Sequence, residues 1–400
     1  MSDAPLGEAR GPDRVGFWLY TGALWTVFGL ALSNLLFGAA VLASLWQRQW
    51  RAVAWRRWRW VLLPLGIYAG CVLTSIVFSR DPQTSARASS GVVSLAILPL
   101  GLLALRGERR VRWVVDGIVA VAALCAAHGL IQQSFLGYGG IDHRIRGPFS
   151  HYMTFAGFLL MADLLLIGMM VCGRHRNLQR WLALGIINLS LLLSLTRSVW
   201  VAFAIALTLC LLLRRPRWVL AYVPAALLLA LLAPVPLLHR VVSIVDLADV
   251  SNYDRLCMAE AGLLMVEERP FFGLGPRMVR ELYPLYRHPT APRRWVPHLH
   301  NNLVHVAAEE GLPAMAALIW LMGGALIVAY RGYRAEARSR SHTPGLYLGG
   351  LLALAAFNLA GLFEYNWGDT EVQRVALFLV ALPWALAGGE PAAAAARDAD

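Results

Sequence analysis

A cluster of imidazole, amide and carboxylate side chains lies just before a long apolar run that begins at Leu312. It comprises His298, His300, Asn301, Asn302, His305, Glu309 and Glu310. An imidazole has an unperturbed pKa near 6.5, so a histidine here is suited to removing a proton at neutral pH. We therefore expect a general base in this cluster, either His300 or His298.

Two other interpretations of the cluster stay open. At helical spacing His298, Asn302, His305 and Glu309 share one stripe, which is also typical of a structural polar network that closes a loop onto a helix bundle. A zinc site is disfavoured, because the histidine spacings are two, five and seven. Helical zinc ligands are usually three or four residues apart, and no cysteine is near.

Two arginines are candidates for binding an anion. Arg197 lies in the short connection 195–199 between apolar runs, where a charged side chain is costly unless it is paired or functional. Arg255 follows Asp254 at the start of an expected helix, whose free N–H groups would help it to bind a phosphate. The alternatives are extension of Arg197 to the membrane interface and a local pair of Arg255 with Asp254. Arg146, in the loop 143–148, is a weaker candidate, and an ordinary loop explains it equally well.

The sequence does not indicate metal-assisted phosphate chemistry. The only Asp-x-Asp pair is Asp398–Asp400, outside the expected external loops. All 36 basic residues are arginine, so a phosphate-binding loop with lysine is excluded. The five cysteines are scattered and show neither metal-ligand nor disulfide spacing. We expect no metal and no cofactor.

The elements that position these residues must lie in a membrane. Hydrophobic residues make up 58% of the 400 residues and charged residues 15%, whereas a soluble domain has about 25% charged residues. This composition excludes a soluble enzyme, a secreted disulfide scaffold and a disordered protein. The net charge of +12 comes from arginine clusters between apolar runs, which is typical of topology signals and not of nucleic-acid binding.

Apolar runs of about 20 residues predict transmembrane helices. The expected spans are 60–78, 91–105, 111–131, 151–172, 181–195, 199–213, 218–238, a run ending at Tyr330, 345–363 and 375–388. The run 15–46 is expected to cross twice, with Ser33–Asn34 as its turn, because arginines flank it on both sides. The sequence thus predicts an all-α polytopic protein with about twelve spans and both termini in the cytoplasm.

Four regions follow from this count. Residues 1–238 hold spans one to nine, 239–298 form a large periplasmic loop with a short amphipathic helix at 255–268, 299–388 hold spans ten to twelve, and 389–400 form a disordered cytoplasmic tail. The long loop carries eight arginines, including Arg277. Because long loops are exempt from the positive-inside rule, these arginines either have no influence on the membrane topology or bind an anionic ligand.

Three local motifs on this polytopic frame resemble those of bacterial O-antigen ligases, within a wider family of O-antigen polymerases and protein O-oligosaccharyltransferases. They are Leu-Thr-Arg-Ser around Arg197, the run from Asp254–Arg255 to Glu268-Arg-Pro-Phe-Phe-Gly-Leu-Gly-Pro, and His300–Asn301 followed by Gly311. The resemblance covers about residues 144–330. It implies a GT-C-like glycosyltransferase architecture in the bacterial inner membrane, with the active site facing the periplasm.

The resemblance also implies the reaction and its partners. Polysaccharide would pass from undecaprenyl diphosphate to a sugar of the lipid A core by inverting, metal-independent displacement. Arg197 and Arg255 would stabilise the diphosphate, with Arg146 or Arg277 as further contributors, and His300 or His298 would be the base. The alternatives are an O-antigen polymerase, a protein O-oligosaccharyltransferase and, in another class, a transporter of an anionic lipid or solute.

Overall fold

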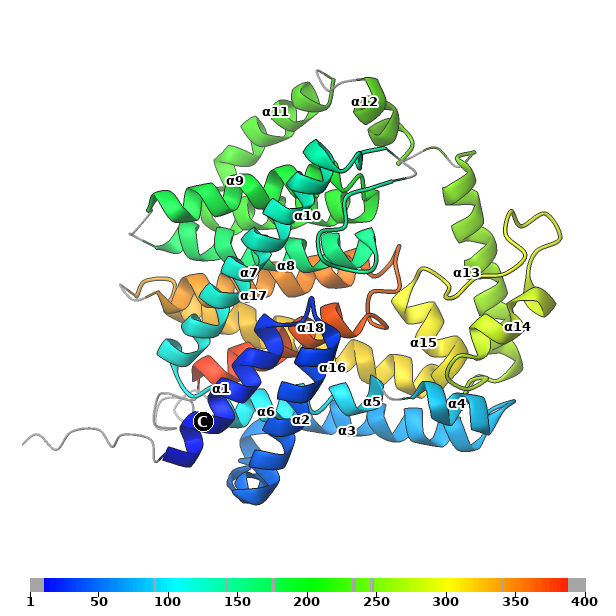
Figure 1. The fold of residues 1–400 in the computed structure, drawn as a ribbon, viewed down its shortest axis with the longest axis horizontal. Helices are drawn as coiled ribbons and strands as arrows, with labels where there is room; N and C mark the ends of the chain where they lie inside the picture. The colour runs from blue at the N-terminus through cyan, green and yellow to red at the C-terminus, as the bar shows by residue number, and fades with distance from the viewer. Residues whose placement is uncertain are drawn as a thin grey trace, which may run out of the picture.

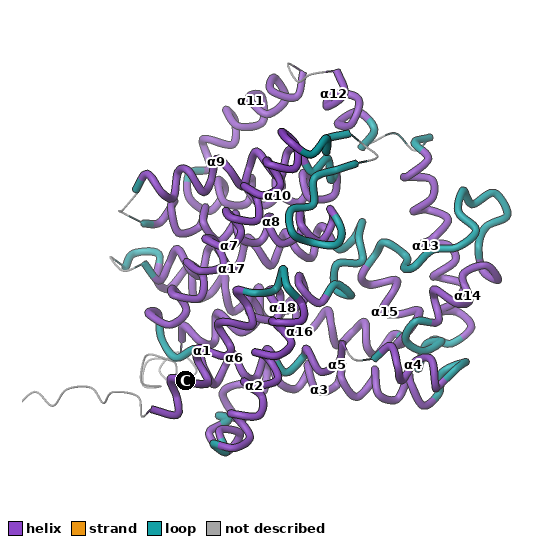
Figure 2. Tube along the Cα trace, in the orientation of Figure 1, coloured by secondary structure: helices purple, strands orange, loops and turns teal. Residues whose placement is uncertain are grey.

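The computed structural model describes residues 11–89, 91–140, 143–173, 177–231, 235–244, 246, 248–339 and 342–387. Over these residues the chain consists of helices and connecting loops, without a strand (Figure 2). The predicted all-α class is confirmed for this part of the chain. The expected tail at 389–400 lies outside the described residues.

Long apolar helices run side by side and form the body of the molecule (Figure 1). Eight described segments are long and apolar enough to cross a membrane. They are α3 (Trp55–Val77), the segment Pro82–Ala104, α7 (Glu108–Phe135), α8 (Tyr152–Cys172), α10 (Arg197–Arg214), α16 (Leu312–Glu336), α17 (Thr343–Ala360) and α18 (Thr370–Ala387). Two shorter apolar helices, α2 (Leu30–Trp46) and α9 (Leu178–Leu193), accompany them. The chain is a multi-pass membrane protein, and the count of twelve spans stays a prediction.

The run 15–46 forms a helical hairpin, but its turn is not at Ser33–Asn34. The turn lies at 26–29, between α1 (Gly11–Trp25) and α2. Ser33 and Asn34 are inside α2 and accept hydrogen bonds from the buried Arg374 of α18. A buried guanidinium in a membrane protein needs such acceptors. The polar pair therefore indicates a helix contact and not a turn.

Two expected spans are interrupted. The segment at 91–105 contains α5 (Gly91–Ser94) and α6 (Ile97–Ala104), preceded by α4 (Pro82–Ala88). Pro99 explains this break, because it lacks an N–H and its ring clashes with the carbonyl four residues earlier, at Leu95. The segment at 218–238 contains α11 (Val219–Leu231) and the start of α12 (Val235–Val242), whose axes run in different directions (Figure 1), after the short 3-10 helix η2 (Pro216–Trp218). A second short 3-10 helix, η1 (Gln49–Ala52), joins α2 to α3.

Glycines bring α8 and α17 into close contact at the centre of the bundle. Gly345 and Gly349 are four residues apart on α17 and face Gly168 of α8. A Cβ added at Gly168 would lie 2.3 Å from the backbone nitrogen of Gly349. Small residues at this spacing let membrane helices approach closely, so these glycines fix the frame that carries the site.

The two ends of the bundle differ. At one end, the α6–α7 connection contacts the ends of two other helices. Gly107 N–H donates to Ala385 O, at the end of α18, at 3.2 Å, and Glu108 Oε2 accepts from Thr343 Oγ1, at the start of α17, at 2.7 Å. At the opposite end α13 (Val250–Glu268) runs across the direction of the long helices, beside α14 (Met278–Tyr286) and α15 (Asn302–Glu310) (Figure 1). The polar clusters of the sequence gather at this second end.

The start of α13 differs from the expected one at residue 255. The helix begins at Val250, and the Asp249 carboxylate accepts hydrogen bonds from the N–H groups of Ser251 and Asn252 at 3.1 and 3.2 Å. An aspartate at this position caps the helix. Arg255 therefore lies beyond the first turn, and Asp249 occupies the N–H groups that we expected to bind a phosphate together with Arg255.

The Gly273–Pro276 turn and the end of α15 hold each other. The N–H groups of Leu274 and Gly275 donate to the carbonyls of Ala308 and Glu309, both at 2.9 Å. In return, the Glu309 carboxylate accepts from the backbone N–H groups of Arg277 at 2.8 Å and Val279 at 3.0 Å. A Cβ at Gly273 would lie 2.4 Å from the Glu309 carbonyl, so only glycine fits there. This contact fixes the start of α14 against α15.

Candidate active site

The histidine segment precedes α15 and is anchored by Asn301. The Asn301 side chain caps α15 by accepting from Leu303 N–H at 2.9 Å and Val304 N–H at 3.0 Å, and it donates to Leu362 O at 3.0 Å. Since the helix starts only at Asn302, the expected helical stripe does not extend back to His298.

His300 has a positive φ of 51°. Such a backbone costs about 1–2 kcal/mol for a residue with a Cβ and is frequent at functional sites.

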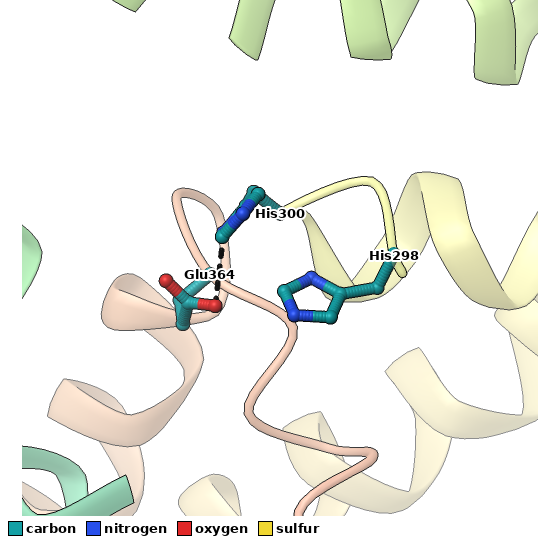
Figure 3. A group of neighbouring side chains, drawn as sticks. All are labelled: His298, His300 and Glu364. Carbon is teal, nitrogen blue, oxygen red and sulfur yellow. Dashed lines mark hydrogen bonds and ion pairs between the residues drawn. The ribbon is translucent and has the colours of Figure 1, made fainter. Parts of the chain in front are cut away.

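A buried carboxylate holds His300 in place. His300 Nδ1 lies 2.9 Å from Glu364 Oε1, in the loop between α17 and α18 (Figure 3). Burial acts to raise the pKa of Glu364, but the neighbouring His300, His298 and Arg255 outweigh it and leave the pKa below its usual value. An ionised carboxylate only accepts hydrogen bonds, so Nδ1 carries the proton. The Nε2 of a neutral His300 is then left with a lone pair that can accept a proton.

His298 lies beside His300 but differs in its surroundings. The two ring centroids are 4.3 Å apart, with the rings edge to face. Burial, followed by the nearby His300, lowers the pKa of His298 to about 3. Its Nδ1 is buried and has no hydrogen-bond partner in the part of the chain that the structure describes. His298 is therefore neutral at physiological pH, is a weaker base than an ordinary histidine and has an unused hydrogen-bonding atom.

The same three side chains also form a possible metal-ligand set. Ligand atoms of His298, His300 and Glu364 all lie within 4.8 Å of one another (Figure 3). Two imidazoles and one carboxylate are a known catalytic zinc set. The Nδ1 of His300 is already engaged with Glu364, however, and a base needs only that pair. A test with a chelator separates these two uses of the cluster.

Four guanidinium groups line a cavity of about 350 Å³ next to His300. They belong to Arg144, Arg197, Arg240 and Arg255. His300, Asn301, Leu362 and Phe363 form another part of its wall, and no acidic side chain is among the described residues that line it. We call this space the arginine cavity. Its charge suits a ligand with several negative charges, because arginine matches phosphate oxygens with a planar set of donors.

Arg197 is the most buried of these arginines, with 7% of its surface exposed. At the start of α10, it donates to Ser243 O at 2.6 Å, to Ser243 Oγ at 2.8 Å and to Asp249 Oδ1 at 3.0 Å. Burial acts to raise the pKa of Asp249, but Arg197, the Asn252 N–H and Arg240 together outweigh it and leave the pKa below its usual value. Arg197 therefore does not extend alone to the interface, because Asp249 fixes its position in the cavity wall.

Arg255 and Arg240 are held by backbone carbonyls. Arg255 Nε donates to Phe363 O at 3.1 Å, and Arg240 Nε donates to Leu195 O at 3.3 Å. Burial lowers the pKa of Arg255. Burial, then the charges of Arg144 and Arg197, lower the pKa of Arg240 to about 10. An anion in the cavity would relieve this crowding of positive charge.

Residues 181–319 match the family model described as O-antigen ligase. The resemblance to the O-antigen ligase family is confirmed. The match includes Arg197, Arg255, His298 and His300, and it supports a membrane glycosyltransferase-like enzyme of the ligase or polymerase type. A comparison with curated proteins finds no match.

The two weaker candidates lie outside the arginine cavity. Arg146 is exposed and donates to Ser150 O at 2.9 Å, whereas Arg144 of the same loop lines the cavity and lies 4.3 Å from the centre of the Tyr152 ring. Arg277 lines a different cavity on the α14 side. The side chain of Gln132 fixes the 143–148 loop. Its Oε1 accepts from the N–H groups of Arg146 at 3.1 Å and Gly147 at 3.0 Å, and its Nε2 donates to Gly147 O at 2.8 Å.

Part of the cluster of polar residues between His298 and Glu310 forms a structural network, as one of our interpretations proposed. Asn302 Nδ2 donates to Asn366 Oδ1 at 2.6 Å, and Asn302 Oδ1 accepts from Trp367 N–H at 3.1 Å. His305 Nδ1 accepts from Leu299 N–H at 3.4 Å, and Glu309 caps the start of α14. The cluster thus combines a network that closes the loop with one histidine that faces the arginine cavity.

The sequence analysis missed the acidic partners of the site. Glu364 and Asp249 lie 64 and 52 residues away from the residues that they bind. The only signal for Glu364 was a glutamate directly after an expected span, at 345–363, where an isolated charge is costly. Arg240 was visible only as one of the eight loop arginines.

Proposed function

We propose that this protein is an O-antigen ligase that transfers polysaccharide from undecaprenyl diphosphate to a sugar of the lipid A core. The observation that carries the proposal is that His300, paired with Glu364, lines the same cavity as four arginines. A base and a cationic site for a leaving group are the two groups that such a displacement needs. A cavity of about 350 Å³ is within the usual range for a small polar ligand.

The donor would place its diphosphate among the arginines. As the bond between the anomeric carbon and the phosphate oxygen breaks, negative charge grows on the departing diphosphate. Arg197 and Arg255, with Arg144 and Arg240 beside them, are preorganised to stabilise that charge, which is often the largest single contribution to catalysis. Arg146 and Arg277 would act at most from outside this cavity.

The acceptor hydroxyl would supply the new bond. His300 Nε2 removes its proton while the oxygen attacks the anomeric carbon from the side opposite the diphosphate. The products are the glycosylated acceptor, undecaprenyl diphosphate and an imidazolium that later releases its proton. Glu364 stabilises that imidazolium, as the carboxylate does in other base–carboxylate pairs. The displacement inverts the anomeric centre and requires neither a metal nor a cofactor.

A bacterial inner-membrane location with the site at the periplasmic face fits this reaction. The arginine-rich connections gather at the end opposite the site, as expected if that end lies in the cytoplasm. Two charged groups within the spans lie away from the arginine cavity: Asp163 pairs with Asn188, and Arg374 pairs with Ser33 and Asn34. This arrangement favours an enzyme over a transporter.

Transfer by purified protein, with and without EDTA, tests the proposal. With an undecaprenyl-diphosphate-linked polysaccharide and a lipid A core acceptor, we expect a glycosylated core and undiminished activity in EDTA. Loss of activity in EDTA, with recovery on adding zinc, would instead assign His298, His300 and Glu364 to a metal. Transfer only to a lipid-linked glycan would indicate a polymerase, and transfer to a protein would indicate an oligosaccharyltransferase. Movement of intact donor across the membrane, without transfer, would indicate a transporter.

A further inference from the structure

A second cavity, of about 290 Å³, lies on the other side of the histidine segment. Its wall includes Tyr68 of α3, Arg280 of α14, Glu310 of α15 and Tyr365 of the α17–α18 loop. Pro297 and His305 line it, whereas Leu299, His300 and Asn301 line the arginine cavity. We call this space the second cavity. The short segment 297–301 thus separates two polar spaces.

Glu310 is an unusual group for the wall of this cavity. Only 8% of the residue is exposed, and its Oε2 is buried without a hydrogen-bond partner among the described residues. Tyr68 hydrogen-bonds to the carboxyl group and in turn accepts from Trp367 Nε1 at 2.9 Å. A buried polar atom without a partner is rare in proteins and needs an explanation. A ligand in the second cavity supplies one.

His298 connects the two cavities. Its ring centroid is 4.3 Å from that of His300, which lines the arginine cavity, and 5.7 Å from that of Tyr365, which lines the second cavity. The Nδ1 of His298 also lacks a hydrogen-bond partner within the described ranges. Unused hydrogen-bonding atoms therefore occur both in the wall of the second cavity, on Glu310, and beside His300, on His298.

We propose that the second cavity binds the saccharide end of the acceptor, with Glu310 as its anchor and His298 as the residue that positions its reacting hydroxyl beside His300. The inference rests on the proposed transfer reaction. Donor and acceptor then enter from opposite sides of the histidine segment and meet at His300. Tyr68, Tyr365 and Trp367 contribute aromatic rings to the wall of this cavity, which suits the apolar faces of a sugar ring.

The protonation state of Glu310 suits this role. Burial raises its pKa to about 8, while Tyr68 lowers it and Glu309 raises it. The carboxyl group is then neutral at pH 7 and can both donate and accept hydrogen bonds. Other charged or titratable groups in the cavity wall are Arg277, Arg280, His305, Glu309 and Tyr365. Above a pH of about 8 the group loses its proton, so we expect weaker acceptor binding there.

Binding measurements on the full-length protein in nanodiscs test the inference without relying on transfer. The probes are a lipid A core glycolipid, without donor, and undecaprenyl diphosphate. We expect Glu310→Ala to weaken glycolipid binding about tenfold and to leave undecaprenyl diphosphate binding unchanged. Glu310→Gln, which keeps a neutral donor and acceptor, should bind like wild type and lose the decline above pH 8. Ala88→Trp, which fills the cavity from α4, should also weaken glycolipid binding.

The controls separate this inference from the proposed function. Glu260→Ala, at an exposed position on α13, should bind both probes like wild type, and retained undecaprenyl diphosphate binding shows that a variant is folded. The inference would be overturned if the wild-type protein did not bind the glycolipid. It would also be overturned if Glu310→Ala and Ala88→Trp bound the glycolipid as tightly as wild type. Binding that depends on Glu310 without any transfer would support this site and contradict the proposed reaction.

Discussion

At the residue scale, the pairing of His300 with Glu364 is the feature on which the proposed chemistry depends. We expect His300→Ala to lower kcat at least about 100-fold, since loss of a general base costs about 10²–10⁴ in rate. Glu364→Gln should lower kcat strongly as well, because the amide cannot stabilise the imidazolium. His298→Ala should mainly raise the KM for the acceptor. Steady-state transfer kinetics with each substrate varied check these expectations, and robust kcat in His300→Ala would contradict them.

The sequence alone identified the basic members of the site but not their acidic partners. Arg197, Arg255 and His300 stand out because polar groups next to apolar runs are costly unless they have a purpose. Their partners, Asp249 and Glu364, are brought close only by long-range packing, which no local pattern encodes. Our proposal of His300 rather than His298 as the base rests on two differences: His300 contacts the Glu364 carboxylate, and burial lowers the pKa of His298.

At the element scale, Glu309 fastens the Gly273–Pro276 turn and α14 to α15. We expect Glu309→Gln to lower the free energy of unfolding by about 2 kcal/mol. The carboxylate accepts hydrogen bonds from two backbone N–H groups, and the amide NH₂ of glutamine, which is a donor, would face one of them. Equilibrium unfolding in mild detergent measures this change. Glu281→Gln is the matched control, since its exposed pair with Arg277 at 3.4 Å should contribute less than about 1 kcal/mol. Equal effects of the two substitutions would contradict this role.

Elements were predictable where hydrophobicity alone decides them. The long spans α3, α7, α8, α16 and α17 follow from apolar runs, whereas the breaks within 91–105 and 218–238 do not. Pro99 was a local signal for the first break. Ser33–Asn34 resembled a turn because the partner of this pair, Arg374, lies far away in the sequence, in α18. The helix α13 begins earlier than we expected because its cap, Asp249, precedes the apolar stripe from which we predicted the helix.

At the scale of the whole molecule, the net charge of +12 separates into two parts. Arginines in the short connections gather at one end of the bundle. The four that line the arginine cavity come from the α7–α8 loop, α10, α12 and α13, so only the folded bundle assembles them. Composition could predict a membrane protein with topology signals, but the meeting of these four side chains depends on tertiary packing.

The central claim is that this assembled cavity binds the diphosphate of the donor lipid. The most direct test is the affinity of the purified full-length protein for undecaprenyl diphosphate. Arg255→Gln, which removes one cation from the cavity, should weaken binding about tenfold, the equivalent of about 1.4 kcal/mol. Arg294→Gln, which removes an exposed arginine of the same loop, should change the affinity by less than about twofold. Wild-type affinity in Arg255→Gln, or an equal loss in both variants, would contradict the account.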